Sequence, residues 1–375
     1  MANNLPRIAI FMRYLTVSGA HGAMLKLAQG LVERGYPVDL VFSWKIDHHL
    51  ELVPEGVRIV DLKSAGLLSS LFDFVKYLRQ ERPIATISTL CTADIINLLA
   101  KPLMGRKHRA IISVQNTVTQ ELKSDRVKSR WIIFLCARYL YFWADGLVAI
   151  SQGVAKDLAT FAKFPLGRIK IIYNPAVTAD IFAKAKDPID HPWFAPGQPP
   201  VVLGVGRLEK QKDFPTLLRA FAKVRQRREV RLVILGWGSE QPQLEALVHE
   251  LGLAEDVTFP GSVRNPYAYM ASSAVFVLSS IYEGLSNALI EALALGVPIV
   301  STDCPHGPAE VLHNGEYGEL VPVGDSDRLA EEILRVLDGK HRQAPESWFK
   351  QFTLDAIVPQ YLELVENRQN NSSLT

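Results

Sequence analysis

The chain is 375 residues long, which at roughly 150 residues per domain predicts two domains, each large enough to bury a core of its own. Its 41 Lys and Arg residues nearly balance its 39 Asp and Glu, so the net charge of +2 gives no general attraction to nucleic acid. A content of 48% hydrophobic and 21% charged residues excludes a disordered or collagen-like chain.

Two features indicate a cytoplasmic location. The three cysteines, Cys91, Cys136 and Cys304, are far apart and show no CxxC spacing, so they predict neither a disulfide framework nor a zinc site and fit a reducing compartment. The first residues lack the long apolar core and small-residue cleavage site of a signal peptide. We therefore expect a cytoplasmic protein, and we interpret the apolar run IAIFM at 8–12 as the first core strand.

The first half of the chain alternates short apolar runs with longer helical stretches. The apolar runs are IAIFM at 8–12, VDLVFS at 38–43, ATIST at 85–89, AIISV at 110–114, GLVAIS at 146–151 and IKIIYN at 169–174. Between the first two, Ala23, Leu27 and Leu31 recur at helical spacing before Gly35. Strands read as continuous apolar runs when helices cover both faces of a parallel sheet. Residues 1–186 are therefore predicted to form one doubly wound, Rossmann-like domain.

Residues 131–150 are about as long as a membrane span. Arg138 and Asp145 interrupt this stretch, and each would be costly in the middle of a bilayer. A helix followed by the buried strand GLVAI accounts for the pattern better, so we expect no transmembrane segment there.

A proline-rich stretch, DPIDHPWFAPGQPP, occupies residues 187–200. Each proline lacks an N–H and restricts the residue before it, so we predict an interdomain linker there. A second Rossmann-like domain is predicted at 201–350. Its strands are expected in VVLGVG at 201–206, LVILG at 232–236, VTFPG at 257–261, AVFVLSS at 274–280 and PIVST at 298–302. The tail, 351–375, reads as a helix that frays at its end.

The segment LSSIYEGLSNALIEALALGVPIVSTD at 278–303 carries the most chemical information. A helix predicted to begin near Ser286 and to end at Gly296 follows a strand, so its first N–H groups lie at the carboxyl edge of the sheet and suit a diphosphate. Glu283 precedes this helix and Glu291 lies more than a turn inside it, so the two carboxylates can accept hydroxyls from two sugar rings. The alternative is that each glutamate is a solvated surface charge. This alternative is weaker for Glu291, because its neighbours in the sequence are almost all apolar.

The string EGLSNALIEALALGVP resembles the E-x7-E signature of retaining glycosyltransferases with the GT-B fold, in particular glycosyltransferase family 4. A single E-x7-E is weak, but further segments resemble this family in the same order over about 10–365. These are VSGAHGAMLKLAQGLVERGYPVDLV, ADGLVAISQGVAKDL, IKIIYNP, the G-x-G-R-L-x-x-x-K segment from Gly204 to Lys212, and STDCPHGPAEVLHNGEYGELVPVGD. The resemblance implies two Rossmann-like domains facing a central cleft, the first binding the acceptor and the second the nucleotide sugar, with the C-terminal helix crossing back to the first.

The resemblance also implies a role for each matching residue. Arg207 and Lys212 would contact the donor diphosphate and stabilise charge that grows on the leaving group. Glu291 would accept the ribose hydroxyls and Glu283 those of the donor sugar, so Glu283, Arg207 and Lys212 are the expected catalytic residues. The other expected donor contacts are Gly19, Val263, Arg264, Gly284, Leu285, Ser286 and Asn287. For Lys212 and Arg264, a solvated loop cation is the alternative.

The sequence departs from the family after the predicted strand at 110–114. Many members carry a histidine there that meets the donor sugar, whereas this chain has Gln115 and Asn116. An amide still hydrogen-bonds a sugar hydroxyl, but it does not act as an acid or base near neutral pH. His21 stands where many relatives have an acidic residue near the glycine loop, so it is either an acceptor contact or simply a histidine at a helix start.

The implied reaction is retaining transfer by front-side attack, in which a donor phosphate oxygen receives the acceptor's proton. We expect no cofactor and no divalent metal. Asp325-Ser326-Asp327 is formally a D-x-D motif, but it precedes the helical run RLAEEILRVL, so Asp325 is expected to cap a helix.

Two other functions are alternatives. A dehydrogenase is disfavoured because Glu209 replaces the third glycine of a dinucleotide-binding loop that would begin at Gly204-x-Gly206. A sugar-nucleotide epimerase of the same fold, or a non-catalytic sugar-nucleotide-binding protein, is the nearer alternative.

A basic strip with neighbouring aromatic residues bears on the acceptor. Between 101 and 140, nine Lys and Arg outnumber two acidic residues, Glu121 and Asp125, and leave a charge of +7. The strip consists of Lys101, Arg106, Lys107, Arg109, Lys123, Arg126, Lys128, Arg130 and Arg138, with Trp131, Phe134, Tyr139, Tyr141, Phe142 and Trp143 beside it. This composition suits an anionic membrane surface, and a core helix with solvated basic ends is the alternative.

We therefore expect a glycan or lipid-linked saccharide acceptor and peripheral association with the inner face of the plasma membrane. A hexose or N-acetylhexosamine would enter a bacterial-type surface polysaccharide, lipopolysaccharide or glycoprotein glycan. UDP is the commonest donor nucleotide in the resembling members, with GDP second.

Overall fold

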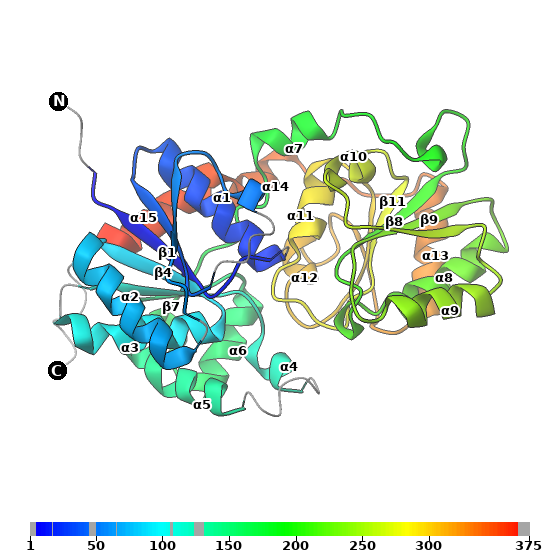
Figure 1. Ribbon diagram of the computed structural model, residues 1–375. Helices are drawn as coiled ribbons and strands as arrows, with labels where there is room; N and C mark the ends of the chain where they lie inside the picture. Colours follow the sequence, from blue (N-terminus) through cyan, green and yellow to red (C-terminus); the bar gives the residue numbers. More distant parts are fainter. Residues whose placement is uncertain are drawn as a thin grey trace. The chain divides into compact units, whose positions relative to one another are not determined.

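The structure is a computed structural model that describes residues 5–16, 18–44, 50–64, 66–105, 108–123 and 131–366. The chain forms two compact units. Unit 1 comprises the residues up to Pro175 and from Gln351 onward, and unit 2 is Ala176–Lys350 (Figure 1).

Unit 1 is built on a seven-stranded parallel sheet with the strand order β3-β2-β1-β4-β5-β6-β7. Its strands are β1 (Ile8–Met12), β2 (Val38–Phe42), β3 (Val57–Asp61), β4 (Ala85–Thr89), β5 (Ala110–Val114), β6 (Gly146–Ala149) and β7 (Ile169–Ile171). All six apolar runs predicted as strands in this half contain one. β3 was not predicted, because this edge strand is half-exposed and carries Arg58 and Asp61, so its sequence shows no continuous apolar run.

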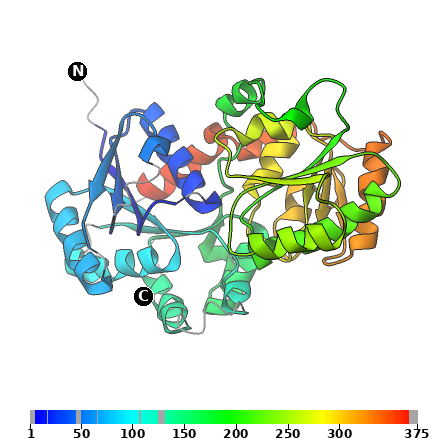
Figure 2. The same ribbon diagram turned by 45° about the vertical axis from the view of Figure 1, so that its right-hand side comes forward.

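Helices cover both faces of the unit 1 sheet. They are α1 (Gly19–Glu33), α2 (Leu67–Glu81), α3 (Cys91–Met104), α4 (Val118–Lys123), α5 (Trp131–Leu140), α6 (Gln152–Ala162) and α15 (Leu354–Glu366). Alternate residues of β1 point to opposite faces, so Ile8 and Ile10 pack in one core with residues of α1 and α15. Phe11 packs in the other core with residues of α2 and α3. Both views show this division (Figures 1 and 2).

The C-terminal helix α15 belongs to unit 1, which confirms the predicted return of the tail. It packs on α1 at Gly30, where a Cβ would come within 2.6 Å of Val358 Cγ2, so only glycine permits this approach. Tyr361 of α15 is completely buried, and its hydroxyl lies 2.9 Å from Ser113 Oγ of β5. The tail is therefore part of the core of the first unit.

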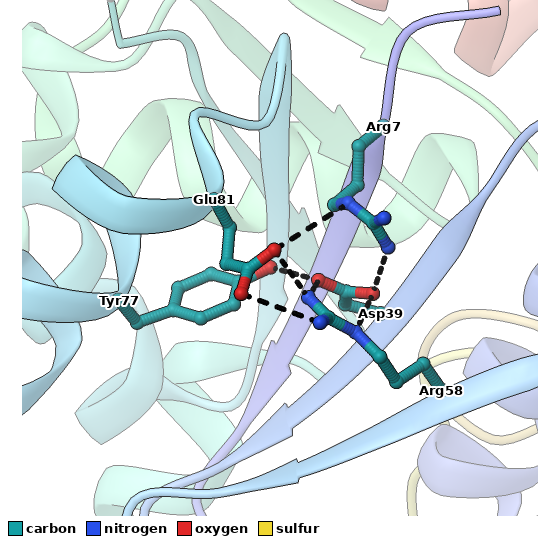
Figure 3. Close-up of polar contacts among 5 residues, drawn as sticks. All are labelled: Arg7, Asp39, Arg58, Tyr77 and Glu81. Carbon is teal, nitrogen blue, oxygen red and sulfur yellow. Dashed lines mark hydrogen bonds and ion pairs between the residues drawn. The ribbon is translucent and has the colours of Figure 1, made fainter. Parts of the chain in front are cut away.

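An ion cluster ties together the amino ends of three unit 1 strands (Figure 3). The buried Asp39 carboxylate of β2 is 2.6 Å from guanidinium nitrogens of both Arg7 and Arg58, and it accepts a 2.6 Å hydrogen bond from Tyr77 of α2. Arg58 also pairs with Glu81 at 2.7 Å. Burial opposes ionisation of Asp39, but the hydrogen bonds from Arg58 and Tyr77 outweigh it and lower the pKa of Asp39. Because ligands bind at the carboxyl ends of such strands, we assign this cluster a structural role.

Residues 131–150 form α5, a short 3-10 helix (Tyr141–Trp143) and the buried strand β6, as predicted. Among the helices in the described ranges, none combines the length and the hydrophobicity that crossing a membrane requires.

Unit 2 repeats the architecture with a six-stranded parallel sheet in the order β10-β9-β8-β11-β12-β13. The strands are β8 (Val201–Val205), β9 (Arg231–Leu235), β10 (Val257–Gly261), β11 (Val275–Leu278), β12 (Ile299–Thr302) and β13 (Glu319–Val321). The helices are α7 (Ala179–Lys184), α8 (Phe214–Arg225), α9 (Gln241–Glu250), α10 (Pro266–Ala271), α11 (Asn287–Ala294), α12 (Pro308–Val311), α13 (Ser326–Leu337) and α14 (Glu346–Phe349). Each of the five runs predicted as strands overlaps a strand, and only β13, a three-residue edge strand, was missed.

The chain passes from unit 1 to unit 2 between Pro175 and Ala176, ahead of the linker predicted at 187–200. The proline-rich stretch lies inside unit 2, where the Arg231 guanidinium sits over the Trp193 ring at 5.3 Å. The only helix or strand in the stretch, all of which the structure describes, is a short 3-10 helix, Pro192–Phe194, but a segment with little regular structure still packs through its side chains.

Candidate active site

The topology of unit 2 places the predicted donor residues at one edge of its sheet. β8 and β11 are neighbours, β9 and β10 lie on one side of them, and β12 and β13 lie on the other. The strand order therefore reverses between β8 and β11, and open α/β sheets bind ligands at the carboxyl ends of such strands. Arg207 and Lys212 follow β8, whereas Glu283 and the start of α11 follow β11.

Lys212 and Glu283 form an ion pair at this point, with Nζ 2.5 Å from Oε1. Both side chains are largely buried, at 16% and 7% exposed. Ser280 Oγ donates a second hydrogen bond of 2.6 Å to the same carboxylate oxygen. Two residues that the sequence assigned separately to the diphosphate and to the sugar are thus in direct contact. Charge-assisted hydrogen bonds of this kind are about twice as strong as neutral ones.

Further hydrogen bonds hold the loops that carry this pair. Ser279 Oγ donates to the carbonyl of Lys212 at 2.7 Å, and the N–H of Ile281 donates to the carbonyl of Gln211 at 2.8 Å. Gln211 Nε2 donates to the carbonyl of Tyr282 at 2.9 Å. One backbone-to-backbone and two side-chain-to-backbone hydrogen bonds therefore join the segment after β8 to the segment after β11, and they hold the ion pair in a defined position.

The helix after Glu283 begins where the sequence predicts. Ser286 is the N-cap of α11, and its hydroxyl accepts the N–H of Leu289 at 3.4 Å. Glu283 therefore lies in the loop and Glu291 inside the helix, as expected. Gly307, at φ +87°, packs closely against this loop, since a Cβ there would lie 3.3 Å from the carbonyl oxygen of Gly284. Gly284 and Leu285 are buried, and Asn287 is half-buried.

Glu291 is half-buried and accepts a hydrogen bond from the phenol of Tyr267 in α10. Burial and the Glu291 carboxylate raise the pKa of Tyr267, so this phenol is neutral near pH 7. Tyr267 is not among the residues that the sequence predicts. The available signal was its position three residues after Arg264, which the resemblance assigns to the donor.

The remaining predicted donor residues of unit 2 lie in more open loops. Arg207 is exposed, and within the described ranges its guanidinium has no hydrogen-bond or ion-pair partner. Val263 is half-buried and Arg264 exposed, in the loop between β10 and α10. These three side chains are therefore accessible to a ligand.

Two glycines that the sequence analysis did not single out shape the Arg207 loop. A Cβ at Gly236, whose φ is +135°, would lie 1.9 Å from the carbonyl oxygen of Gly206, and one at Gly238 would lie 2.2 Å from that of Leu208. The N–H of Leu208 donates to the carbonyl of Trp237 at 2.9 Å. The Gly-Trp-Gly spacing after β9 was the available signal, because only glycine allows such close approach of two backbones.

In unit 1, Ser18 is the N-cap of α1 and Gly19 is its first, exposed residue. His21 is 2% exposed, and its Nδ1 lies 2.6 Å from Ser18 Oγ. Its Nε2 is buried without a partner among the described residues. Burial lowers the pKa of His21 to about 4, so the ring is neutral at pH 7. The structure thus places this histidine inside unit 1 at the helix start.

Gln115 and Asn116 follow β5 at the carboxyl edge of the unit 1 sheet. Gln115 Nε2 donates to Ser113 Oγ at 2.9 Å, and its Oε1 accepts from Asn174 Nδ2 at 3.0 Å. The side-chain oxygen of Asn116 accepts the N–H of Thr117 at 3.0 Å. Gln115 is therefore held from both ends of its amide.

Asp325 caps α13, as predicted, because its Oδ1 accepts the N–H groups of Asp327 and Arg328 at 3.1 and 2.9 Å. Asp327 pairs with Lys223 at 2.7 Å. In the part of the chain that the structure describes, no three His, Cys, Asp or Glu side chains are grouped so as to hold a metal ion.

Two parallel, doubly wound sheets, with paired charges and a helix start at a strand-order reversal, define a class of nucleotide-binding α/β protein. Two family models match the chain: "Glycosyl transferase 4-like domain" over residues 18–175 and "Glycosyl transferases group 1" over residues 199–339. The chain belongs to this family of GT-B glycosyltransferases.

Two curated relatives and one solved structure illustrate the similarity. N-acetylgalactosamine-N,N'-diacetylbacillosaminyl-diphospho-undecaprenol 4-alpha-N-acetylgalactosaminyltransferase of Campylobacter jejuni is 34% identical over 67% of this chain and 66% of its own length. The lipopolysaccharide core biosynthesis glycosyltransferase LpsE of Rhizobium meliloti is 32% identical over 60% of this chain and 65% of its own. The chain thus spans slightly less than two thirds of each. HepE of Anabaena, solved with UDP-glucose, superposes with a TM-score of 0.77 at 19% identity, over 96% of this chain and 98% of its own, and so shares the GT-B fold.

Proposed function

We propose that the protein is a retaining glycosyltransferase that moves a hexose or N-acetylhexosamine from a UDP-sugar to a glycan or lipid-linked saccharide acceptor in the assembly of a bacterial-type surface glycan. The observation that carries this proposal is the Lys212–Glu283 pair beside the start of α11, at the strand-order reversal of unit 2. The names of the relatives support the substrate classes: two act in lipid-linked glycan or lipopolysaccharide synthesis, and HepE was solved with UDP-glucose.

In this proposal, the first-turn N–H groups of α11 and the side chains of Arg207 and Lys212 bind the donor diphosphate. Glu283 accepts hydroxyls of the transferred sugar, and Gln115 hydrogen-bonds a sugar hydroxyl. The acceptor oxygen bonds to the anomeric carbon as the bond to the diphosphate breaks, and the acceptor proton passes to a phosphate oxygen. Negative charge grows on the diphosphate, and the two cations stabilise it more in the transition state than in the bound donor.

Glu291 is proposed to accept the ribose hydroxyls. Replacing it with alanine removes a binding contact that is the same in the bound donor and in the transition state, so we expect affinity for UDP to fall about tenfold to a hundredfold, a loss of roughly 1.4–3 kcal/mol. Isothermal titration with UDP and with UDP-sugars measures this. Glu250→Ala, an exposed glutamate on α9, is the matched control. Unchanged affinity in Glu291→Ala would remove the ribose assignment, and a thermal-shift panel of UDP- and GDP-sugars identifies the donor.

Divalent metal is proposed to be unnecessary, because Arg207 and Lys212 supply the positive charge that a bound cation supplies in other transferases. Transfer is expected to proceed at an unchanged rate in excess chelator. A chelator-sensitive rate that is restored by added Mg²⁺ or Mn²⁺ would contradict this.

Peripheral membrane association is proposed for the face of unit 1 formed by α2, α3 and α5, which pack side by side. Phe72 of α2 and Tyr139 of α5 are about two-thirds exposed, and Phe142 and Trp143 are nearly half-exposed. Some residues of the basic strip already have partners within unit 1, so fewer cations are available to lipid headgroups than the sequence indicates. Lys101 pairs with Asp145 at 2.7 Å, Arg109 donates to the carbonyl of Leu364, and Tyr141 is buried. Arg106, Lys107, Arg126, Lys128 and Arg130 lie outside the described residues.

Flotation with vesicles of phosphatidylglycerol and phosphatidylethanolamine tests the membrane proposal. We expect the protein to float with these vesicles and not with neutral phosphatidylcholine. Burying one aromatic ring contributes about 1.5–3 kcal/mol, so the variants Tyr139→Ser and Trp143→Ser should each weaken binding about tenfold or more. Neutralising Arg126, Lys128 and Arg130 together should have a similar effect. The control is Phe182→Ser, which changes an exposed aromatic residue of unit 2. The idea fails if the wild type does not float, or if none of these changes in unit 1 alters flotation.

A further inference from the structure

The Gln115 amide is the end of a chain of hydrogen bonds that begins on the returning helix α15. The Tyr361 hydroxyl lies 2.9 Å from Ser113 Oγ, which accepts Gln115 Nε2 at 2.9 Å. On its other side, Gln115 Oε1 accepts Asn174 Nδ2 at 3.0 Å. The four side chains come from α15, from β5 and the loop after it, and from the segment after β7, and all belong to unit 1.

Burial increases along this chain away from Gln115. Gln115 is only half-buried, whereas Asn174, Ser113 and Tyr361 are at most 3% exposed. A buried hydroxyl or amide costs free energy unless it is hydrogen-bonded, and a phenylalanine would fill the volume of the Tyr361 ring equally well. Packing alone therefore does not explain the phenol. Gln115 is the most exposed member of this group of four polar side chains.

The arrangement determines what Gln115 offers a ligand. A glutamine amide has two N–H donors and two acceptor sites on its oxygen. Among the residues that the structure describes, Ser113 takes one donor and Asn174 fills one acceptor site, which leaves one N–H and one lone pair of Gln115. Because both ends of the amide are held, these groups point in one fixed direction. A glutamine free to rotate would lose about 1–2 kcal/mol of side-chain entropy on binding, and the network removes much of that cost in advance.

We propose that Tyr361 and Asn174 are positioning residues that orient the Gln115 amide toward a sugar hydroxyl. This inference rests on the sugar contact of Gln115 in the proposed function. The C-terminal helix then contributes to the sugar specificity of unit 1. The network also holds in place Gln115, which stands where many family members have a histidine. The network is uncharged near neutral pH, since a phenol is protonated there and burial raises the pKa of Tyr361 further, to about 12.

The first test monitors the Gln115 side-chain amide by NMR and does not require enzymatic activity. The side-chain NH2 signal of Gln115 is assigned in the spectrum of ¹⁵N-glutamine-labelled full-length protein by its loss in Gln115→Ala. In Tyr361→Phe and in Asn174→Ala, we expect this signal to move toward the shift of free glutamine and its hydrogen exchange to accelerate about tenfold or more. An unmoved signal in both variants would overturn the positioning role, whatever the protein's activity.

The second test is a double-mutant cycle on transfer, with the nucleotide sugar that gives the largest thermal shift as donor. Tyr361→Phe is expected to lower kcat about tenfold with little change in KM, and to have no further effect in a Gln115→Ala background. Equal losses in both backgrounds would mean a general structural role and would overturn the proposal. Full activity of Gln115→Ala would instead refute the sugar contact in the proposed function, while the amide signal still decides the positioning.

Tyr77→Phe is the matched control. It also removes a buried phenol hydrogen bond in unit 1, the 2.6 Å contact with Asp39, but at the amino ends of the strands (Figure 3). We expect it to lower the melting temperature at least as much as Tyr361→Phe does, and to leave kcat and the Gln115 signal unchanged.

Discussion

Replacing Glu283 with glutamine is expected to lower kcat for transfer by about 10²–10³ while changing UDP affinity less than threefold. Glutamine has nearly the same shape and keeps an oxygen that can accept from Ser280, so the loop should stay in place. The substitution removes the negative charge beside Lys212. It thereby weakens the hydrogen bonds that residue 283 accepts from the sugar hydroxyls as positive charge develops on the sugar ring. Steady-state kinetics, together with UDP titration, separates the two effects.

Glu332→Gln is a suitable control for Glu283→Gln. Glu332 is a half-buried carboxylate of α13 that pairs with Arg335 at 3.1 Å, away from the strand-order reversal. Its replacement should affect stability by less than about 1 kcal/mol and leave transfer unchanged. If Glu283→Gln transfers sugar at the wild-type rate, Glu283 has no part in the reaction.

Replacing Lys212 with methionine is expected to have two separable effects. Transfer should fall by about 10² or more, because a cation facing the leaving diphosphate is lost. The free energy of unfolding should fall by about 3 kcal/mol, because the Glu283 carboxylate, 7% exposed, is left buried without its counter-ion. Denaturant unfolding and kinetics measure the two.

The double variant Lys212→Met with Glu283→Gln distinguishes these effects. It removes the unpaired charge, so most of the lost stability should return while transfer stays impaired. Lys223→Met is the control: Lys223 is 40% exposed, and its pair with Asp327 on the surface is worth less than about 1 kcal/mol. Recovery of transfer in the double variant would show that Lys212 serves stability alone.

The sequence predicts the architecture well because both sheets are parallel and covered on both faces. Central strands such as β1 and β11 read as continuous apolar runs. The edge strands β3 and β13 do not, since one carries charged residues and the other is three residues long. The proline-rich stretch at 187–200 shows a limit of another kind: composition reveals irregular structure, but it does not show which unit the segment packs on.

The candidate site was predictable in its residues and less so in its contacts. The helix start at Ser286 and the Asp325 cap follow from local rules that need no tertiary structure. The Lys212–Glu283 pair joins residues 71 positions apart, and the Tyr361–Ser113 contact joins residues 248 positions apart. Such contacts depend on strand order, which apolar runs alone do not reveal.

Product analysis tests the central claim most directly. The protein is incubated with the nucleotide sugar that stabilises it most and with a lipid-linked saccharide acceptor, and the products are examined by mass spectrometry and NMR. The account predicts the sugar on the acceptor, with the anomeric configuration that it had in the donor, and one equivalent of free nucleoside diphosphate. A free nucleotide sugar with an inverted ring carbon, or a donor that is bound but never consumed, would contradict it.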